Sequence, residues 1–134
     1  MSTPTEQLII KQKREFPRIV EELLTHQRKR SHWAWYVWPT EKKGFSEPYP
    51  KTAVYIHTAG FLLANTDLKK WTEILKICNG LIEDNEGRLY GIIPRIDQPR
   101  IKYFLRFWLH SVRDVSQQYP AFWAELKRHQ KYCS

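Results

Sequence analysis

Residues 28–39 hold the densest group of side chains that could do chemistry, and they read Arg-Lys-Arg-Ser-His-Trp-Ala-Trp-Tyr-Val-Trp-Pro. Guanidinium and ammonium groups pair with phosphate oxygens, and indole rings stack on the flat face of a base. The segment therefore predicts a binding site for a nucleotide-like ligand. The residues predicted to contact this ligand are Arg28, Lys29, Arg30, Ser31, Trp33, Trp35 and Trp38.

The same segment has a structural interpretation. Tryptophan is usually largely buried, so the three indoles could belong to the core while the cations form a solvated helix end. In an extended segment, Trp33 and Trp35 would share one face, and His32 and Tyr36 would share the other. A half-buried strand would alternate more cleanly with small polar residues, so the spacing slightly favours the binding interpretation. The pattern does not say which indoles are core and which line a pocket.

Composition predicts one folded domain spanning residues 1–134. A hydrophobic content of 42% with 14% aromatic residues excludes a disordered chain, and the length suits one core. The net charge of +8 favours anionic partners, which leaves nucleotides, nucleic acids and acidic proteins open. The cations recur along the chain, which indicates a folded basic surface rather than a disordered arm.

Several classes of site and location are not expected. Cys78 and Cys133 are the only cysteines, and the five histidines show no metal-ligand spacing, so neither a disulfide framework nor a metal site is predicted. No glycine-rich phosphate loop or dinucleotide fingerprint is present, and no cofactor is predicted. No apolar stretch is long enough to span a membrane, and residues 1–6 carry no apolar signal region. We therefore expect a cytoplasmic protein.

Apolar spacing predicts a mainly α fold of five or six helices, with at most two or three short strands. Pro17 should end a short first helix, because proline disfavours helical geometry in the residue before it. A second helix should then run to Gln27, with Phe16, Ile19, Val20, Leu23 and Leu24 as its buried stripe. Further helices are predicted over residues 52–64, 68–83, 97–112 and 120–131, and a short strand over residues 90–93. The proline-rich residues 39–51 should form a loop that serves as a lid or pocket wall.

The string from Arg28 to Pro39 resembles the basic-Ser-His-Trp-x-Trp-aromatic-x-aromatic-Pro signature of a mostly bacterial family once labelled calpastatin-like, which is related to the NADAR (YbiA-like) superfamily. The similarity covers roughly the whole chain at low identity, including the Tyr55-Ile56 helix start, and is weakest over residues 81–100. It implies a NADAR-like, mainly helical fold and a function in ADP-ribose or NAD chemistry. Characterised NADAR proteins cleave N-glycosidic bonds of ribose phosphates.

The chain departs from the NADAR pattern at the residue before the histidine. NADAR proteins commonly place a glutamate there, whereas Ser31 precedes His32 here. Cleavage of an N-glycosidic bond needs a carboxylate to stabilise an oxocarbenium-like state or to activate water. A hydrolase would have to recruit this carboxylate from elsewhere, and the candidates are Glu41, Glu47 and Asp97.

Asp97 is the preferred catalytic carboxylate, because Arg95 and Arg100 would keep it ionised and could also contact the ligand. His32 would act as a proton donor or contact a ribose hydroxyl. Each of these side chains is also typical of an ordinary helix cap or structural hydrogen bond.

Three hypotheses follow from the sequence. The first is a binder or an N-glycosidase of an ADP-ribose-like nucleotide. The second is a nucleic-acid-binding basic domain, and the third is a catalytically silent interaction protein of the same fold. The sequence does not determine the substrate or the oligomeric state.

Overall fold

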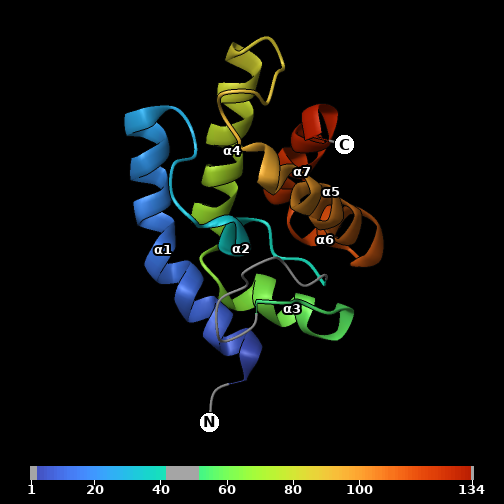
Figure 1. Ribbon diagram of the computed structural model, residues 1–134. Coiled ribbons are helices and arrows are strands. Elements are labelled where there is room, and N and C mark those ends of the chain that lie inside the picture. The colour runs from blue at the N-terminus through green and yellow to red at the C-terminus, as the bar shows by residue number, and fades with distance from the viewer. Residues whose placement is uncertain (1–2, 42–51, 134) are drawn as a thin grey trace.

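Helices form all the regular secondary structure in the described part of the chain, which is residues 3–41 and 52–133 of a computed structural model (Figure 1). The prediction of a mainly helical fold is confirmed, and the described residues contain no strand. The α-helices are α1 (Pro4–His26), α2 (Ala34–Val37), α3 (Ile56–Asn65), α4 (Leu68–Asp84), α5 (Gln98–Arg106), α6 (Val115–Gln118) and α7 (Pro120–Cys133). A 3-10 turn (Arg95–Asp97) precedes α5, and a π-helical segment (Phe107–Ser111) follows it.

The predicted break at Pro17 is wrong, because α1 is one continuous helix of 23 residues with Pro17 inside it. Its start is fixed by a capping box between Thr3 and Glu6. Proline removes one backbone hydrogen bond from a helix interior, but the buried stripe of α1 continues on both sides of it. Packing of this stripe against the other helices outweighs the local preference.

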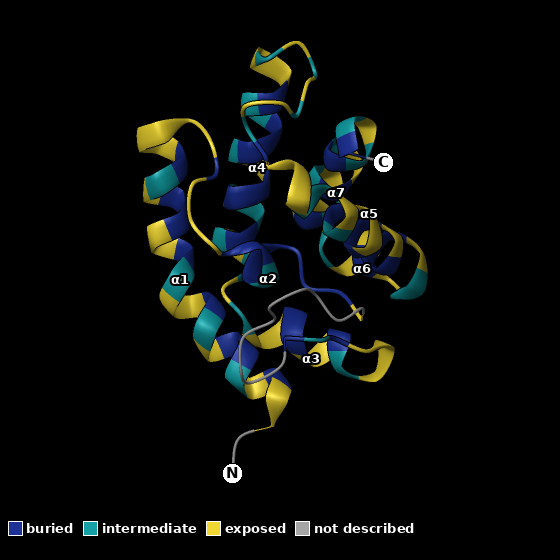
Figure 2. Ribbon diagram, in the orientation of Figure 1, coloured by how far each residue is buried: buried dark blue, intermediate teal, exposed yellow. Residues whose placement is uncertain are grey.

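The core is centred on α4, which packs against α1 on one side and α7 on the other (Figure 1). Buried residues line the inward faces of these helices (Figure 2). Trp71 of α4 lies at the centre, and its ring centroid is 6.2 Å from that of Phe16, 5.6 Å from that of Trp108 and 4.8 Å from that of Phe122. Rings contributed by α1, α4, the π-helical segment and α7 therefore meet at one residue.

Two buried indoles also fix the end of α2 and the chain directly after it. The Nε1–H group of Trp71 donates to the carbonyl oxygen of Val37 at 2.8 Å, and that of Trp108 donates to the carbonyl oxygen of Pro39 at 2.9 Å. Each bond pairs a buried indole donor with a backbone carbonyl at the end of α2 or two residues after it. The aromatic segment is thereby anchored to the centre of the core.

Several local expectations differ from the structure. Residues 90–93 form turns rather than a strand, with Gly91 at φ +82°, because the chain must reverse after α4. Leu24 is exposed rather than buried, since the stripe of α1 ends at Leu23. The helix predicted from residue 52 begins only at Ile56, and α2 and α6 were not predicted. Residues 42–51, the greater part of the predicted lid, lie outside the described residues, as does Glu47.

None of the described helices is both long enough and apolar enough to cross a membrane.

Candidate functional site

The cationic turn that follows α1 is built by the end of that helix. Gln27 caps α1 in the left-handed conformation at φ 57°, and its N–H group donates to the carbonyl oxygen of Leu23. The chain thus reverses directly before the cations. Arg28 and Arg30 are exposed while Lys29 between them is buried, which is the alternation of an extended segment. Two guanidinium groups therefore face outward from one short stretch.

Glu22, one turn before the end of α1, holds this segment in place. Its Oε2 atom accepts hydrogen bonds from the backbone N–H of Arg30 at 2.9 Å, the backbone N–H of Ser31 at 3.2 Å and the indole Nε1–H of Trp33 at 2.6 Å. Burial alone would raise the pKa of Glu22, but hydrogen bonds from Ser31, Arg30 and Trp33 lower that pKa below its ordinary value. An ionised carboxylate thus organises the backbone of the cationic turn.

The sequence did not say which of the three tryptophans belong to the core, and their burial in the structure answers this question. Trp33 is only 4% exposed, and Trp38 is fully buried with its Nε1–H donating to Nε2 of His129 at 3.2 Å. Their ring centroids lie 5.4 Å apart. Trp35 is half-buried. Trp33 and Trp38 are therefore core residues, and the prediction that they stack on a ligand is corrected because neither ring has an accessible face.

A pocket of about 280 Å³ opens beside the cationic turn. One wall is Arg28, Lys29 and Arg30, and the other is the turn from Gly91 to Pro94. The backbone N–H of Lys29 donates to the carbonyl oxygen of Ile92 at 2.8 Å, which ties the two walls together. The pocket is thus formed by segments that are about sixty residues apart in the sequence. Its lining combines cationic with apolar residues, and none of the described residues that line it is acidic.

Lys29 closes the inner side of the site through a buried ion pair. Its Nζ atom lies 2.8 Å from Oδ2 of Asp97 and 5.2 Å from the centre of the Trp33 ring. The Lys29 side chain is 5% exposed and that of Asp97 is 14% exposed. Lys29, which was predicted to contact phosphate, therefore neutralises Asp97 instead. The prediction that Arg95 and Arg100 are the partners of Asp97 missed this ammonium group.

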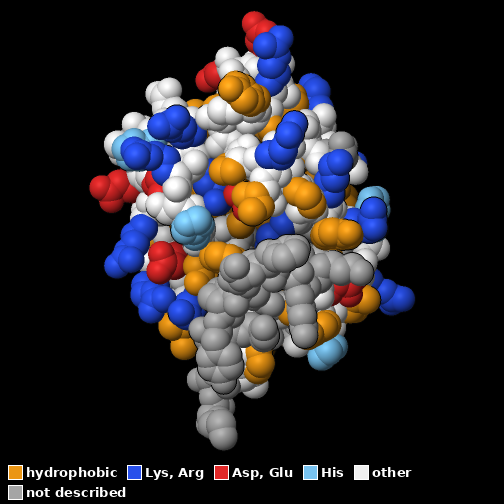
Figure 3. Space-filling model, viewed as in Figure 1, with side chains coloured by type: hydrophobic (Ala, Val, Ile, Leu, Met, Phe, Trp, Pro, Cys, Tyr) orange, Lys and Arg blue, Asp and Glu red, His pale blue; other side chains and the backbone are white. Residues whose placement is uncertain are grey.

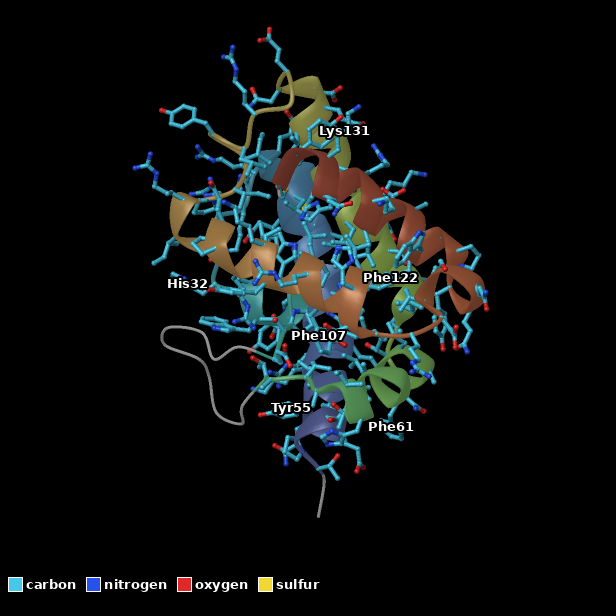
Figure 4. The ribbon with its side chains drawn as sticks, turned by 90° about the vertical axis from the view of Figure 1, so that its right-hand side faces the viewer. His32, Tyr55, Phe61, Phe107, Phe122 and Lys131 are labelled. Carbon is cyan, nitrogen blue, oxygen red and sulfur yellow. The ribbon has the colours of Figure 1, made fainter. Side chains whose placement is uncertain are left out.

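The remaining predicted site residues do not assemble into a catalytic group. His32, Glu41 and Arg95 are exposed, and Arg100 is half-buried. Figure 4 shows His32 at the edge of the molecule. Among the described residues, no hydrogen bond or ion pair joins His32 to Glu41 or Asp97. The structure thus groups Arg28, Lys29 and Arg30 around the pocket and pairs Lys29 with Asp97, whereas no described hydrogen bond or ion pair joins His32 or Glu41 to them.

Glu22 is the residue of this site that the sequence did not reveal. It stands beside Glu21 near a helix end, where a carboxylate is ordinarily solvated. No spacing rule links a helical carboxylate to donors eight to eleven residues later across a helix end. The chain reversal at Gln27 is what brings these donors back to Glu22.

Known proteins give no information about this site. No protein-family model, curated protein or solved structure matches this chain. The NADAR relationship stays a prediction. Within the described residues, no group of three or more histidine, cysteine or acidic side chains could hold a metal ion.

Proposed function

We propose that this protein binds a phosphorylated nucleotide of the ADP-ribose type, with a phosphate in the pocket beside Arg28 and Arg30. The observation that carries the proposal is that two exposed arginines, one with its backbone held by Glu22, line a pocket to which no described residue contributes a carboxylate. Arginine suits this task because its planar fork matches two phosphate oxygens. A preorganised backbone reduces the entropy lost when the ligand binds.

Binding, rather than hydrolysis, is the function that this geometry supports. Asp97 would have to stabilise an oxocarbenium-like carbon, but its Oδ2 atom is engaged by the buried ammonium group of Lys29. Glu41 is exposed and forms no described contact with His32. N-glycoside hydrolysis therefore stays a prediction, which an assay of base release from NAD and ADP-ribose would test directly.

The binding proposal is tested by calorimetric titration with ADP-ribose. Replacing Arg30 by Ala should weaken binding about 10- to 150-fold, the range for a hydrogen bond to a charged group. The melting temperature should change little, because the Arg30 side chain is exposed and its only side-chain hydrogen-bond partner among the described residues is His26. Lys76→Ala is the matched control, since it removes an exposed cation from α4. Equal affinities of the two variants would disprove the proposed site.

A further inference from the structure

The pocket continues directly into a cationic helix face. Residue Pro94 lines the pocket, and the 3-10 turn and α5 follow from Arg95 to Arg106 without interruption. Figure 4 shows this segment running across the molecule toward Phe107. The exposed residues of the segment that share one helical face are Arg95, Pro99, Lys102, Tyr103 and Arg106.

The charge on this face is not compensated. Asp97 is the only acidic residue between Arg95 and Arg106, and it is turned inward against Lys29. Within the described residues, Arg95 and Lys102 form no ion pair, whereas Arg128 on α7 is paired with both Glu83 and Glu125. The space-filling view shows Lys and Arg side chains spread between apolar ones above the grey segment (Figure 3). Such a face attracts an extended anion.

Aromatic and apolar side chains are exposed beside these cations. Tyr90 is 89% exposed and directly precedes Gly91 of the pocket wall, and Ile96 is 81% exposed and follows Pro94 by two positions. The Tyr90 backbone is nevertheless fixed, because the Asn85 side-chain amide donates to the carbonyl oxygens of Arg88 at 3.0 Å and Tyr90 at 2.8 Å. Because its backbone is fixed and its ring is exposed, Tyr90 offers a preformed surface on which a base could stack.

Tyr103 supplies a second ring farther along the face. It is 41% exposed, and the Arg106 guanidinium lies 5.8 Å from the centre of its ring. From Arg95 to Arg106 the helix rises about 16 Å, which corresponds to about five nucleotides at the stacked spacing of one strand, about 3.4 Å. The face is therefore longer than one nucleotide and carries both of the groups that a nucleotide chain requires.

We propose that this face binds single-stranded nucleic acid, with a terminal phosphate in the pocket, a base on Tyr90, and the following phosphates along Lys102 and Arg106. The placement of the terminal phosphate rests on the proposed function. Cationic grooves with aromatic platforms bind single strands because unpaired bases expose their faces. A duplex keeps its bases stacked inside, so Tyr90 would have no base to engage.

Fluorescence anisotropy with labelled, 5′-phosphorylated oligothymidylates of one, four and eight nucleotides tests this proposal. Affinity should rise steeply from one to four nucleotides. The double variant Lys102→Ala/Arg106→Ala should weaken binding of the octamer at least tenfold and leave the mononucleotide affinity unchanged. The slope of log affinity against log salt should fall by about 1.4, because about 0.7 is lost per phosphate contact.

Tyr90 variants separate stacking from charge. Tyr90→Ala should weaken octamer binding about 5- to 150-fold, the range for one stacked base, and Tyr90→Phe should retain it. Lys76→Ala serves again as the matched charge control, and thermal melts establish that each variant is folded.

Affinity independent of strand length, or equal loss in the Lys102→Ala/Arg106→Ala and Lys76→Ala variants, would overturn the strand proposal. Equal affinity for a duplex of the same length would overturn it as well. In each case, ADP-ribose binding that is lost in Arg30→Ala would leave the pocket proposal standing. Absence of binding to ADP-ribose and to every oligonucleotide would overturn both.

Discussion

Glu22 shows how one carboxylate can decide the geometry of a whole segment. It accepts from two backbone N–H groups and one indole, and these three donors come from the residues that begin the aromatic run. The backbone of Arg30 is held directly by this carboxylate. The carboxylate thus fixes the backbone of the cationic turn beside the pocket.

Replacing Glu22 by Ala should lower the free energy of unfolding by about 1–3 kcal/mol, because the indole N–H of buried Trp33 loses its partner. It should also weaken ADP-ribose binding, since the backbone of Arg30 loses the hydrogen bond that holds it. Chemical denaturation and calorimetry measure the two effects. Glu21→Ala is the control, as Glu21 is the exposed neighbour on the same helix. If both variants behave alike, Glu22 does not organise the turn.

The interface between α4 and α7 contains a buried polar chain that joins it to the aromatic segment. Nδ1 of His129 lies 2.7 Å from Oδ1 of Asn79, and Nε2 of His129 accepts from the indole of Trp38. The Asn79 amide donates to the carbonyl oxygen of Glu125 at 3.0 Å. These partners require a neutral imidazole with its proton on Nδ1, because Nε2 must accept. Burial accordingly lowers the pKa of His129 to about 4.

Because His129 is buried in this interface, the free energy of unfolding should fall in acid. The unfolded chain binds a proton on His129 below its ordinary pKa of 6.5, whereas the folded chain binds one only below about 4. Stability is therefore fully present above pH 6.5 and decreases as the pH falls toward 4, by about 3 kcal/mol in total. Urea unfolding of the native protein and of His129→Gln across this range measures the difference. Parallel pH dependences of the two proteins would contradict a buried neutral histidine.

At the level of the whole molecule, the Lys29–Asp97 pair connects the two halves of the chain. Lys29 follows α1 and Asp97 precedes α5, and the two side chains meet beneath the pocket. A buried pair adds little net stability against apolar replacements, but the loss of one partner leaves an uncompensated buried charge. The site and the packing of the two halves are thus coupled.

Asp97→Asn should therefore lower the free energy of unfolding by about 3–5 kcal/mol, since the ammonium group of Lys29 stays buried without its counter-charge. The double variant Lys29→Met/Asp97→Asn should recover most of this loss. Denaturation of both variants gives two of the free energies of unfolding that a double-mutant cycle requires. If the Asp97→Asn variant is as stable as the native protein, the ion pair does not stabilise the fold. Asp97 would then again be a candidate catalytic residue.

The sequence by itself determined the helical fold and much of the core. Trp71, Leu75, Cys78 and Ile82 recur with helical spacing in α4 and are all buried as predicted, because that period is a local property of the chain. The same holds for Ile101, Phe104 and Leu105 of α5. The sequence also singled out the Arg-Lys-Arg segment, since composition alone marks such a cluster.

Only the tertiary structure decided which side chains of that segment face solvent and which partners they have. Burial of Trp33 and Trp38 depends on α7 and on Glu22, and Lys29 meets Asp97 across 68 positions of the sequence. Continuity of α1 through Pro17 likewise depends on packing that local preferences do not contain. Periodicity reports which face of an element is apolar. The pairing of charges and donors between distant elements depends on where the folded chain brings them together.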